Sequence, residues 1–189
     1  MKFAQSLILA ASLILSSHAL AADNYQVDPA HSFVNFRVQH LQVSYVYGRF
    51  NEPKGTIVLD DADPTKSTME FSVQADKVDT GNSGRDAHLK KSDFFSASEF
   101  PEITFKSTSV KQLDDNTLEV TGDLSLHGVT KSITTQVKRI GTGPGMKGET
   151  RTGMETMFKI KRSDYGMTYM VPQVGDEVTL LIGIEAIKQ

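Results

Sequence analysis

Apolar and polar residues alternate along most of the chain after residue 22. Between residues 33 and 40, for example, Val34, Phe36 and Val38 fall on one face and Asn35 and Arg37 on the other. A period of two is typical of a β-strand with one buried face. The same pattern recurs at residues 45–51, 55–59, 69–75, 103–106, 118–126, 133–137, 154–160 and 178–186. The sequence therefore predicts eight or nine strands.

Short connections between these segments indicate that neighbouring strands are antiparallel. Asp114, Asp115 and Asn116, for example, form a hairpin loop between two of them. About eight antiparallel strands close into a barrel, which removes the unpaired edges. The predicted fold is all-β, a single antiparallel eight-stranded β-barrel. A barrel of this size is either filled by its own side chains or holds one small ligand.

Residues 82–101 interrupt the alternation. Ser83 and Asp86 have the spacing of a capping box, which predicts a short helix, and a long loop follows before Pro101. Three large aromatic residues lie in this loop: Phe94, Phe95 and Phe100. Because exposed rings are costly, we expect them to pack against the barrel, so that the segment acts as a plug or lid at one end.

Three features favour a hollow barrel. Gly48 and Gly122 fall within apolar stripes, where they leave space, although each alternatively marks a bulge or bend. A group of methionines supplies flexible side chains that suit an adaptable cavity, although such residues also fill gaps in a core. These are Met146, Met154, Met157, Met167 and Met170. The third feature is the aromatic lid, which a filled barrel does not need.

Polar residues continue two of the apolar stripes. His40 follows Val38, and Arg162 follows Ile160, so both are expected to point inward at a cavity mouth, where they could fix a ligand's head group. Alternatively, the strand ends fray and both side chains reach water. In the lid, Arg85 and His88 are further polar candidates, with helix capping or a solvated ion pair as the alternative explanation.

Residues 1–21 have the features of a cleaved secretory signal peptide. Lys2 precedes an apolar run at residues 7–15, and Ala19-Leu20-Ala21 forms a small-residue cleavage site. The apolar run is too short to span a bilayer. We therefore expect the barrel domain to comprise residues 22–189 and to be exported, most simply to a bacterial periplasm.

The composition narrows the range of partners. The chain has 20 Lys and Arg residues against 23 Asp and Glu, a net charge of −3, which argues against nucleic acid or an anionic membrane surface as the main partner. Without cysteine it has no disulfide, thiolate nucleophile or soft metal site. The spacing of the histidines does not indicate zinc. We expect no metal, no cofactor and no stable membrane insertion, while the short strands permit a homodimer.

The recognisable catalytic motifs are absent or in the wrong context. Residues 143–148 match G-x-G-x-x-G, but they join two strand patterns and contain a proline, so we interpret them as a hairpin loop. His40, His88, Asp93 and Asp164 have no nucleophile beside them in the sequence. We therefore predict a binding protein. The alternatives are a barrel enzyme that acts on a small amphipathic substrate through inward His and Asp groups, and a ligand-free interaction module.

Several segments together resemble the YceI-like family of polyisoprenoid-binding proteins. The resemblance covers nearly all of residues 22–189 and is carried by V-D-P-A-H-S-F-V-N-F from Val27, V-D-T-G-N-S-G-R-D-A-H-L from Val78, F-P-E-I-T-F-K-S-T from Phe100, G-D-L-S-L-H-G-V-T-K from Gly122 and R-S-D-Y-G-M from Arg162. It implies a lipocalin-like barrel with a short helix and a long loop at one end. It also implies a periplasmic carrier or store for a long isoprenoid lipid, of the prenyl quinone precursor or polyprenyl phosphate type.

The resemblance and the inward faces of the predicted strands together define the candidate ligand-binding residues. The apolar lining is predicted to comprise Phe36, Val38, Leu89, Phe94, Phe95, Phe105, Leu124, Met154, Phe158, Ile160, Tyr165 and Met167. The polar candidates are His31, His40, Arg85, His88 and Arg162. Tyr165 stands where family members usually carry Phe, and its hydroxyl is expected to reach either a head group or water.

Overall fold

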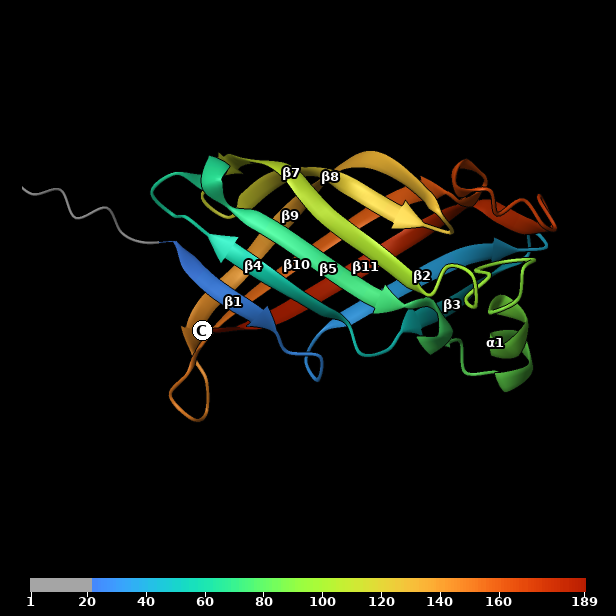
Figure 1. The fold of residues 1–189 in the computed structure, drawn as a ribbon, viewed down its shortest axis with the longest axis horizontal. Helices are drawn as coiled ribbons and strands as arrows, with labels where there is room; N and C mark the ends of the chain where they lie inside the picture. Colours follow the sequence, from blue (N-terminus) through green and yellow to red (C-terminus); the bar gives the residue numbers. More distant parts are fainter. Residues whose placement is uncertain (1–21) are drawn as a thin grey trace, which may run out of the picture.

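The computed structural model describes residues 22–189, and the predicted signal peptide at 1–21 lies outside the described residues. Strands dominate the chain (Figure 1). They are β1 (Asp23–Val27), β2 (Phe33–His40), β3 (Ser44–Phe50), β4 (Lys54–Leu59), β5 (Thr68–Gln74), β6 (Val78–Asp79), β7 (Glu102–Asp114), β8 (Thr117–Leu126), β9 (Val129–Pro144), β10 (Thr150–Lys161) and β11 (Val174–Lys188). The helices are α1 (Ser83–Leu89) and the 3₁₀ turns η1 (Pro64–Lys66), η2 (Ala75–Lys77) and η3 (Arg162–Tyr165).

The eleven strands occupy eight positions around a closed barrel. β11 pairs with β10 on one side, and on the other side it pairs with β2 and, further along, with β1. β1 and β2 therefore form one interrupted strand. β3 with β4, and β5 with β6, are interrupted in the same way. Every pairing is antiparallel, and the structure confirms the predicted eight-stranded barrel.

Specific hydrogen bonds hold the break between β1 and β2 against β11. The Asp28 amide donates to the Glu185 carbonyl over 2.8 Å. The Ser32 hydroxyl donates to the same carbonyl and accepts from the Glu185 amide. These bonds satisfy buried backbone groups that the missing ladder would leave unpaired. The wall of the barrel therefore remains continuous across this interruption.

One seam of the barrel is open over part of its length. The pairing of β10 with β9 ends where Thr156 lies opposite Val137. Beyond this point, residues 157–161 pair with β11 alone and residues 129–136 pair with β8 alone. The Thr156 hydroxyl donates to the Gln136 carbonyl over 2.8 Å and accepts from the Thr135 hydroxyl over 2.7 Å. This threonine pair lies at the point where the two strands separate.

The lid at residues 82–101 contains α1 as predicted, but the N-terminus of the helix is capped differently. The Asn82 side chain accepts from the Arg85 amide and is the N-cap. The Asp86 carboxylate accepts instead from the amide and hydroxyl of Thr80. The capping box predicted from Ser83 is therefore wrong, because Asn82 is the N-cap and the helix begins one residue earlier than that motif requires.

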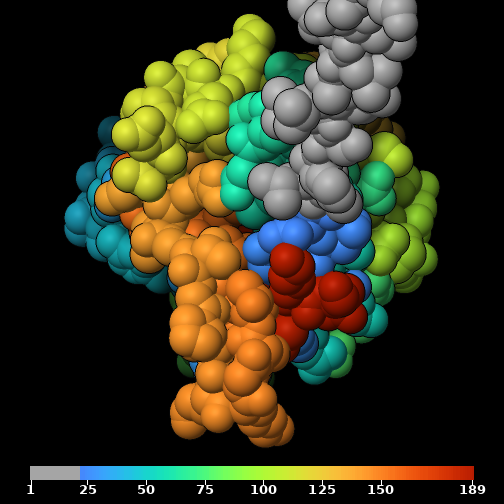
Figure 2. Space-filling view, turned by 90° about the vertical axis from the view of Figure 1, so that its left-hand side faces the viewer, coloured from blue at the N-terminus to red at the C-terminus, as the bar shows by residue number. Residues whose placement is uncertain are grey.

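The two ends of the barrel differ. At one end, here called the α1 end, lie the lid, the β2–β3 turn and the loop between η3 and β11 (Figure 1). At the opposite, terminal end lie the start of β1, the end of β11 and the β9–β10 loop (Figure 2). The largest packed core cluster belongs to the terminal half; its buried residues are Tyr25, Val27, Ile57, Leu59, Met69, Val110, Leu118, Val120, Val137, Met154, Ile184 and Ala186.

Candidate ligand cavity

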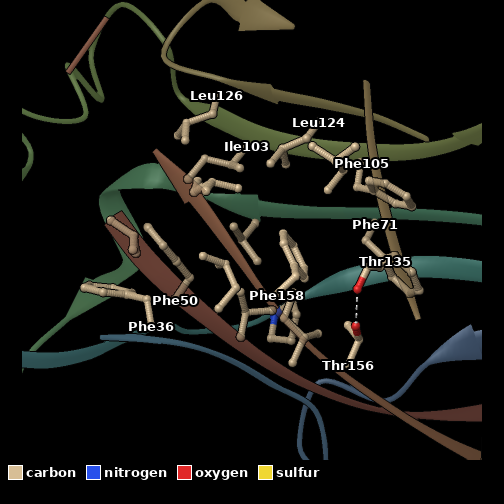
Figure 3. A pocket seen from close by; sticks show the side chains of 18 of the residues that line it. Phe36, Phe50, Phe71, Ile103, Phe105, Leu124, Leu126, Thr135, Thr156 and Phe158 are labelled. Atoms are coloured by element: carbon tan, nitrogen blue, oxygen red, sulfur yellow. Dashed lines mark hydrogen bonds between the residues drawn. The ribbon is translucent and has the colours of Figure 1, made fainter. Parts of the chain in front are cut away.

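The α1 half of the barrel contains a cavity of about 200 Å³. Its wall is almost wholly apolar and includes many phenylalanine rings (Figure 3). It extends from Leu89 and Phe94 in the lid down to Val120 and Ile184, which also belong to the packed core. The packed core therefore forms the floor of the cavity. An elongated space with hydrocarbon walls suits an extended apolar chain.

The structure places all but one of the predicted apolar residues on the cavity wall. β2, β7, β8 and β10 supply theirs by the alternation of side chains along a strand, and the lid supplies its own from above. The residues that reach the wall are Phe36, Val38, Leu89, Phe94, Phe95, Phe105, Leu124, Met154, Phe158, Ile160 and Met167. Whether they bind a ligand stays a prediction.

Tyr165 is the exception. Only 2% of its surface is exposed, and it packs beside the cavity with Leu124, Leu126 and Met167. Burial raises the pKa of its phenol, which keeps the hydroxyl neutral. Its place in η3, after the end of β10, takes it out of the inward stripe of that strand. The expectation that its hydroxyl reaches a head group or water therefore has no support in this geometry.

The interpretation of the glycines as sources of empty space is wrong. A Cβ atom at Gly48 would come within 2.8 Å of the Phe36 ring, and one at Gly122 within 2.7 Å of the Phe105 ring. Each glycine lets a neighbouring phenylalanine lie flat over the backbone. The glycines thus position two rings of the cavity wall.

The methionine group is also split by the structure. Met154 and Met167 line the cavity, as a flexible wall requires. Met146 is 98% exposed in the β9–β10 loop, and Met157 and Met170 are exposed at the surface as well. Their proximity in sequence does not place them together, because adjacent strand residues face opposite sides and the loops lie at different ends.

Aromatic contacts hold the lid over the cavity. The Phe95 ring meets Phe50 edge-on at 5.3 Å between centroids. Phe94 meets Tyr169 of the loop before β11 at 5.5 Å, and His88 packs edge-on against both of these rings. The lid is therefore fastened both to β3 and to the neighbouring loop, as expected for a closing element.

Arg162 is the polar candidate that reaches the cavity. It is only 4% exposed, and its guanidinium donates to four backbone carbonyls at 2.8–2.9 Å. The acceptors are Gly175, Met167, Tyr169 and Val174. Burial lowers the pKa of the Arg162 guanidinium, and the charge of Asp176 opposes this shift. Arg162 thereby holds the loop before β11 in place at the cavity wall.

The other polar candidates lie elsewhere, and none of the described histidines lines the cavity. His40 ends β2 opposite Ser44 and Val174 and, unlike Val174, is not among the residues that line the cavity, so its predicted role at the cavity mouth stays a prediction. Arg85 donates to Thr80, and the His88 ring lies 2.8 Å from the Asp93 carboxylate on the outside of the lid. Strand parity predicts direction only while the strand continues, and all these residues lie at or beyond strand ends.

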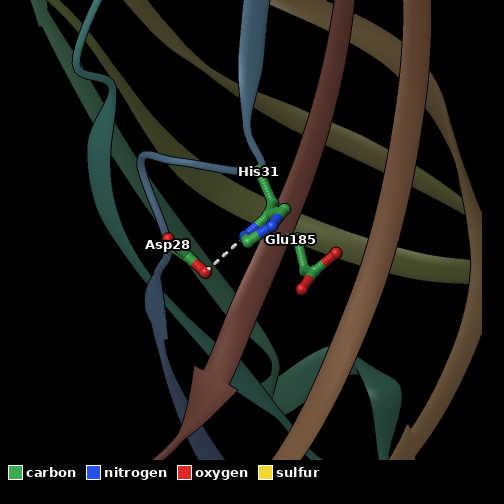
Figure 4. A group of neighbouring side chains, drawn as sticks. All are labelled: Asp28, His31 and Glu185. Carbon is green, nitrogen blue, oxygen red and sulfur yellow. Dashed lines mark hydrogen bonds and ion pairs between the residues drawn. The ribbon is translucent and has the colours of Figure 1, made fainter. Parts of the chain in front are cut away.

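His31 belongs to a separate polar cluster at the break between β1 and β2 (Figure 4). His31, Asp28 and Glu185 bring possible metal-binding atoms within 4.8 Å of one another. The Arg151 guanidinium already donates to both carboxylates, at 2.8 Å to Asp28 and 2.5 Å to Glu185. Hydrogen bonds from His31 and then Arg151 lower the pKa of Asp28 to about 2. The cluster is therefore an ion-paired clasp of the terminal half.

The open seam between β9 and β10 lies in the hollow half. Ile133 and Ile160, on its two edges, line both the cavity and an outer cleft of about 410 Å³. Lys131, Lys159 and Lys161 border that cleft on the outside. Thr135 and Thr156 at the seam also reach the cavity wall (Figure 3). The cavity and the outer cleft thus share residues along this seam.

Sequence reasoning missed other residues of the wall. Many lie on the inward stripes that it had already identified, so extending those stripes would have found them; these are Val34, Ile103, Leu126, Ile133, Val178, Leu180, Ile182 and Ile184. Phe50 and Phe71 carried the same signal within predicted strands. The seam left no signal in the sequence, because unpaired and paired strand segments alternate in the same way.

Comparisons with known proteins identify the relatives of this fold. A family model described as the YceI-like domain matches residues 25–186. Protein YceI of Escherichia coli O17:K52:H18 is 39% identical over 181 residues, which cover 95% of this chain and 94% of that protein. Within residues 22–189, no helix is long and apolar enough to cross a membrane.

Two solved structures show the same barrel. BcnA of Burkholderia cenocepacia matches with a TM-score of 0.77 and 21% identity, covering 84% of this chain and 98% of that one. A polyisoprenoid binding domain from Saccharophagus degradans, described as implicated in plant cell wall breakdown, matches with a TM-score of 0.68 and 17% identity. That match covers 87% of this chain and 98% of the domain. At these identities the two likenesses concern the fold.

Proposed function

Because the chain belongs to the YceI-like family, we propose that it binds one long isoprenoid lipid in the hollow half of its barrel and carries or stores it in the periplasm. The observation that carries this proposal is the cavity itself, with its hydrocarbon wall, packed floor and aromatic lid. The polyisoprenoid-binding domain of the same fold supports the choice of an isoprenoid. The predicted signal peptide supports the location.

The driving force is the removal of hydrocarbon from water, which contributes about 0.8 kcal/mol for each buried CH₂ group. A long chain therefore binds more tightly than a short one, and the tail contributes more than the head group. The aliphatic and aromatic wall offers few directional contacts, so branched chains of prenyl quinone precursors and of polyprenyl phosphates suit it equally.

Lipid extraction tests the proposal. The protein is purified from its own host without detergent, and both the native complex and its organic extract are analysed by mass spectrometry. We expect one lipid for each chain, with a mass series that differs by C₅H₈ units. An empty barrel that also fails to take up a purified polyprenol would contradict the proposal.

A matched pair of variants on β11 links binding to the cavity. Val178 lines the cavity, whereas Leu181 of the same strand is exposed on the outer face. Val178→Trp fills the cavity and should lower the lipid content at least several-fold, while Leu181→Trp should leave it unchanged. Equal lipid content in both variants would place the lipid outside the barrel.

The alternative of a barrel enzyme receives no support from the described geometry. The groups considered for catalysis, His40 and Asp93, do not line the cavity, and Asp93 instead pairs with His88 on the lid. A general base must lie within hydrogen-bond reach of its substrate. Binding is therefore the function that the site supports best.

A further inference from the structure

An apolar surface lies at the α1 end, outside the cavity. Six exposed side chains form it, and we call this group the apolar tip: Leu41, Val43, Tyr45, Tyr169, Met170 and Val171. Val43, the most exposed of these, is 84% exposed. Single exposed apolar residues are ordinary, but a contiguous group of them marks an interaction surface.

The apolar tip is one surface built from two segments that are far apart in the sequence. The β2–β3 turn supplies Leu41 and Val43, the start of β3 supplies Tyr45, and the loop before β11 supplies the other three. The Leu41 amide donates to the Gln173 carbonyl over 2.6 Å, and His40 pairs with Val174 in the ladder. Both segments lie at the same end of the barrel as α1 (Figure 1). The buried guanidinium of Arg162 fixes the second segment.

Neither segment carries a charged residue. Residues 41–47 read L-Q-V-S-Y-V-Y and residues 166–175 read G-M-T-Y-M-V-P-Q-V-G, in a chain in which 23% of the residues are charged. An exposed loop that only meets water gains solubility from charge, so its absence in two adjacent segments is informative. A surface of aliphatic residues with tyrosines is typical of groups that lie at the interface of a bilayer.

The apolar tip continues into the cavity wall. Val174 follows the second segment's exposed residues and lines the cavity, and Met167 at the start of the segment does the same. Phe94 of the lid lines the cavity and contacts Tyr169 of the tip. An unbroken apolar path therefore connects the outer surface at this end with the space inside the barrel.

We propose that the apolar tip binds the surface of a lipid bilayer, so that the barrel exchanges its lipid with the membrane through the α1 end. The inference rests on the proposed function, because an apolar path between the tip and the cavity would serve only a protein that binds an apolar ligand. The contact is peripheral: aliphatic side chains enter the interfacial region and the tyrosines remain at head-group level. It needs no anionic lipid, because the two segments carry no charged residue and the chain is net negative. The Arg37 guanidinium beside the tip lies 4.8 Å from the centroid of the Tyr45 ring.

A second copy of the chain fits the tip less well. The tip consists of six side chains on two loops, whereas a stable protein interface takes roughly 20–30 residues and about 800 Å² from each partner. A bilayer accommodates a small convex tip, since its surface deforms around inserted side chains. The experiment below distinguishes binding to a bilayer from binding to a second copy of the chain.

Vesicle flotation tests the proposal with the whole mature chain. The vesicles consist of phosphatidylcholine, with and without phosphatidylglycerol. The tip variant combines Val43→Glu with Met170→Glu. The control combines Met146→Glu with Met157→Glu, which adds the same charge at exposed methionines away from the tip. We expect the wild type and the control to float with both kinds of vesicle, and the bound fraction of the tip variant to fall about tenfold.

The lipid content of the same samples separates this proposal from the proposed function. A wild-type protein that holds lipid but ignores both kinds of vesicle would overturn the docking surface and leave the carrier intact. An empty barrel that still floats, and stops floating in the tip variant, would support the docking surface while removing the carrier. A tip variant that floats normally but loses self-association in light scattering would overturn the proposal in favour of a second copy.

Discussion

The two halves of the barrel interior are built from the same strands, yet one is packed and the other is hollow. β8 shows the difference along a single stripe: Leu118 packs in the core of the terminal half, Val120 belongs to both the core and the cavity floor, and Leu124 and Leu126 line the cavity. In the terminal half β9 pairs with β10, with one irregularity between Gly153 and Met154, and in the hollow half the two strands separate. The interior is filled by side chains where β9 and β10 are hydrogen-bonded to each other, and it is hollow where these two strands separate.

Different polar groups stabilise the two halves. In the terminal half, Arg151 pairs with Asp28, Glu149 and Glu185 and ties β1, β10 and β11 together at the surface. In the hollow half, Arg162 is buried and its guanidinium donates to backbone carbonyls of the loop before β11 and of the start of β11. The first arrangement joins strands to one another. The second holds a loop at the wall of the cavity.

The largest expected effect comes from truncating isoleucines in the two halves. Ile57 is 1% exposed in the packed core, so Ile57→Ala should lower the free energy of unfolding by about 3–4 kcal/mol. Ile160 borders the cavity, so Ile160→Ala should cost no more than about 1–2 kcal/mol, because it enlarges an existing space. Urea unfolding of the lipid-free proteins measures both. Equal costs would contradict the difference between the halves.

The second prediction concerns the buried arginine. Arg162→Met leaves the carbonyls of Met167, Tyr169 and Val174 without their donor and should cost about 3 kcal/mol. Hydrogen exchange should increase at residues 166–175 while the terminal half keeps its protection. Lys161→Met, one residue earlier and exposed, is the control. Uniform loss of protection in both halves would show that Arg162 supports the whole barrel rather than one loop.

A glycine substitution should affect the hollow half through its neighbouring ring. Gly48→Ala brings a Cβ atom against the Phe36 ring, so we expect a cost of about 2 kcal/mol and a reduced lipid content as the ring moves toward the cavity. No heavy atom lies within 4 Å of a Cβ atom built at Gly183, which makes Gly183→Ala the matched control. Unfolding and lipid extraction measure the two effects. Unchanged lipid content in Gly48→Ala would show that the cavity tolerates the displaced ring.

The smallest predicted effect is a dependence of stability on pH in the terminal half. The pKa of Asp28 is about 2 in the folded protein against an ordinary value of 3.8, so its carboxylate stabilises the fold above the higher value. That contribution, about 1 kcal/mol after solvent screening, is lost as the pH falls from 3.8 toward 2. Urea unfolding at several pH values in this range measures the free energy of unfolding. That free energy should change less steeply with pH in Asp28→Asn than in the wild type. The same pH dependence in both proteins would show that the Asp28 ion pairs do not stabilise the fold.

The barrel could be predicted from the sequence because alternation with period two reports which side chains face inward. The closing role of the lid also followed, since Phe94 and Phe95 had to be buried somewhere. Alternation says nothing about height along the barrel axis. It could not show that Leu118 packs in a solid core while Leu124 lines a space.

The errors arose where strands end and where rings meet glycines. Tyr165 lies beyond the end of a strand, so its direction follows the local turn rather than the stripe. The space beside Gly48 is occupied by the Phe36 ring of the neighbouring strand. The alternation along one strand does not reveal such a contact between two strands. The signal peptide at residues 1–21 and the periplasmic location stay predictions.

A crystal structure of the protein purified from its own host without detergent tests the central claim most directly. We expect continuous branched-chain density from the lid at Phe95 to the floor at Met154, with the terminal half unchanged. Rings of Phe36, Phe105 and Phe158 that meet in a closed core, with no space between them, would contradict it.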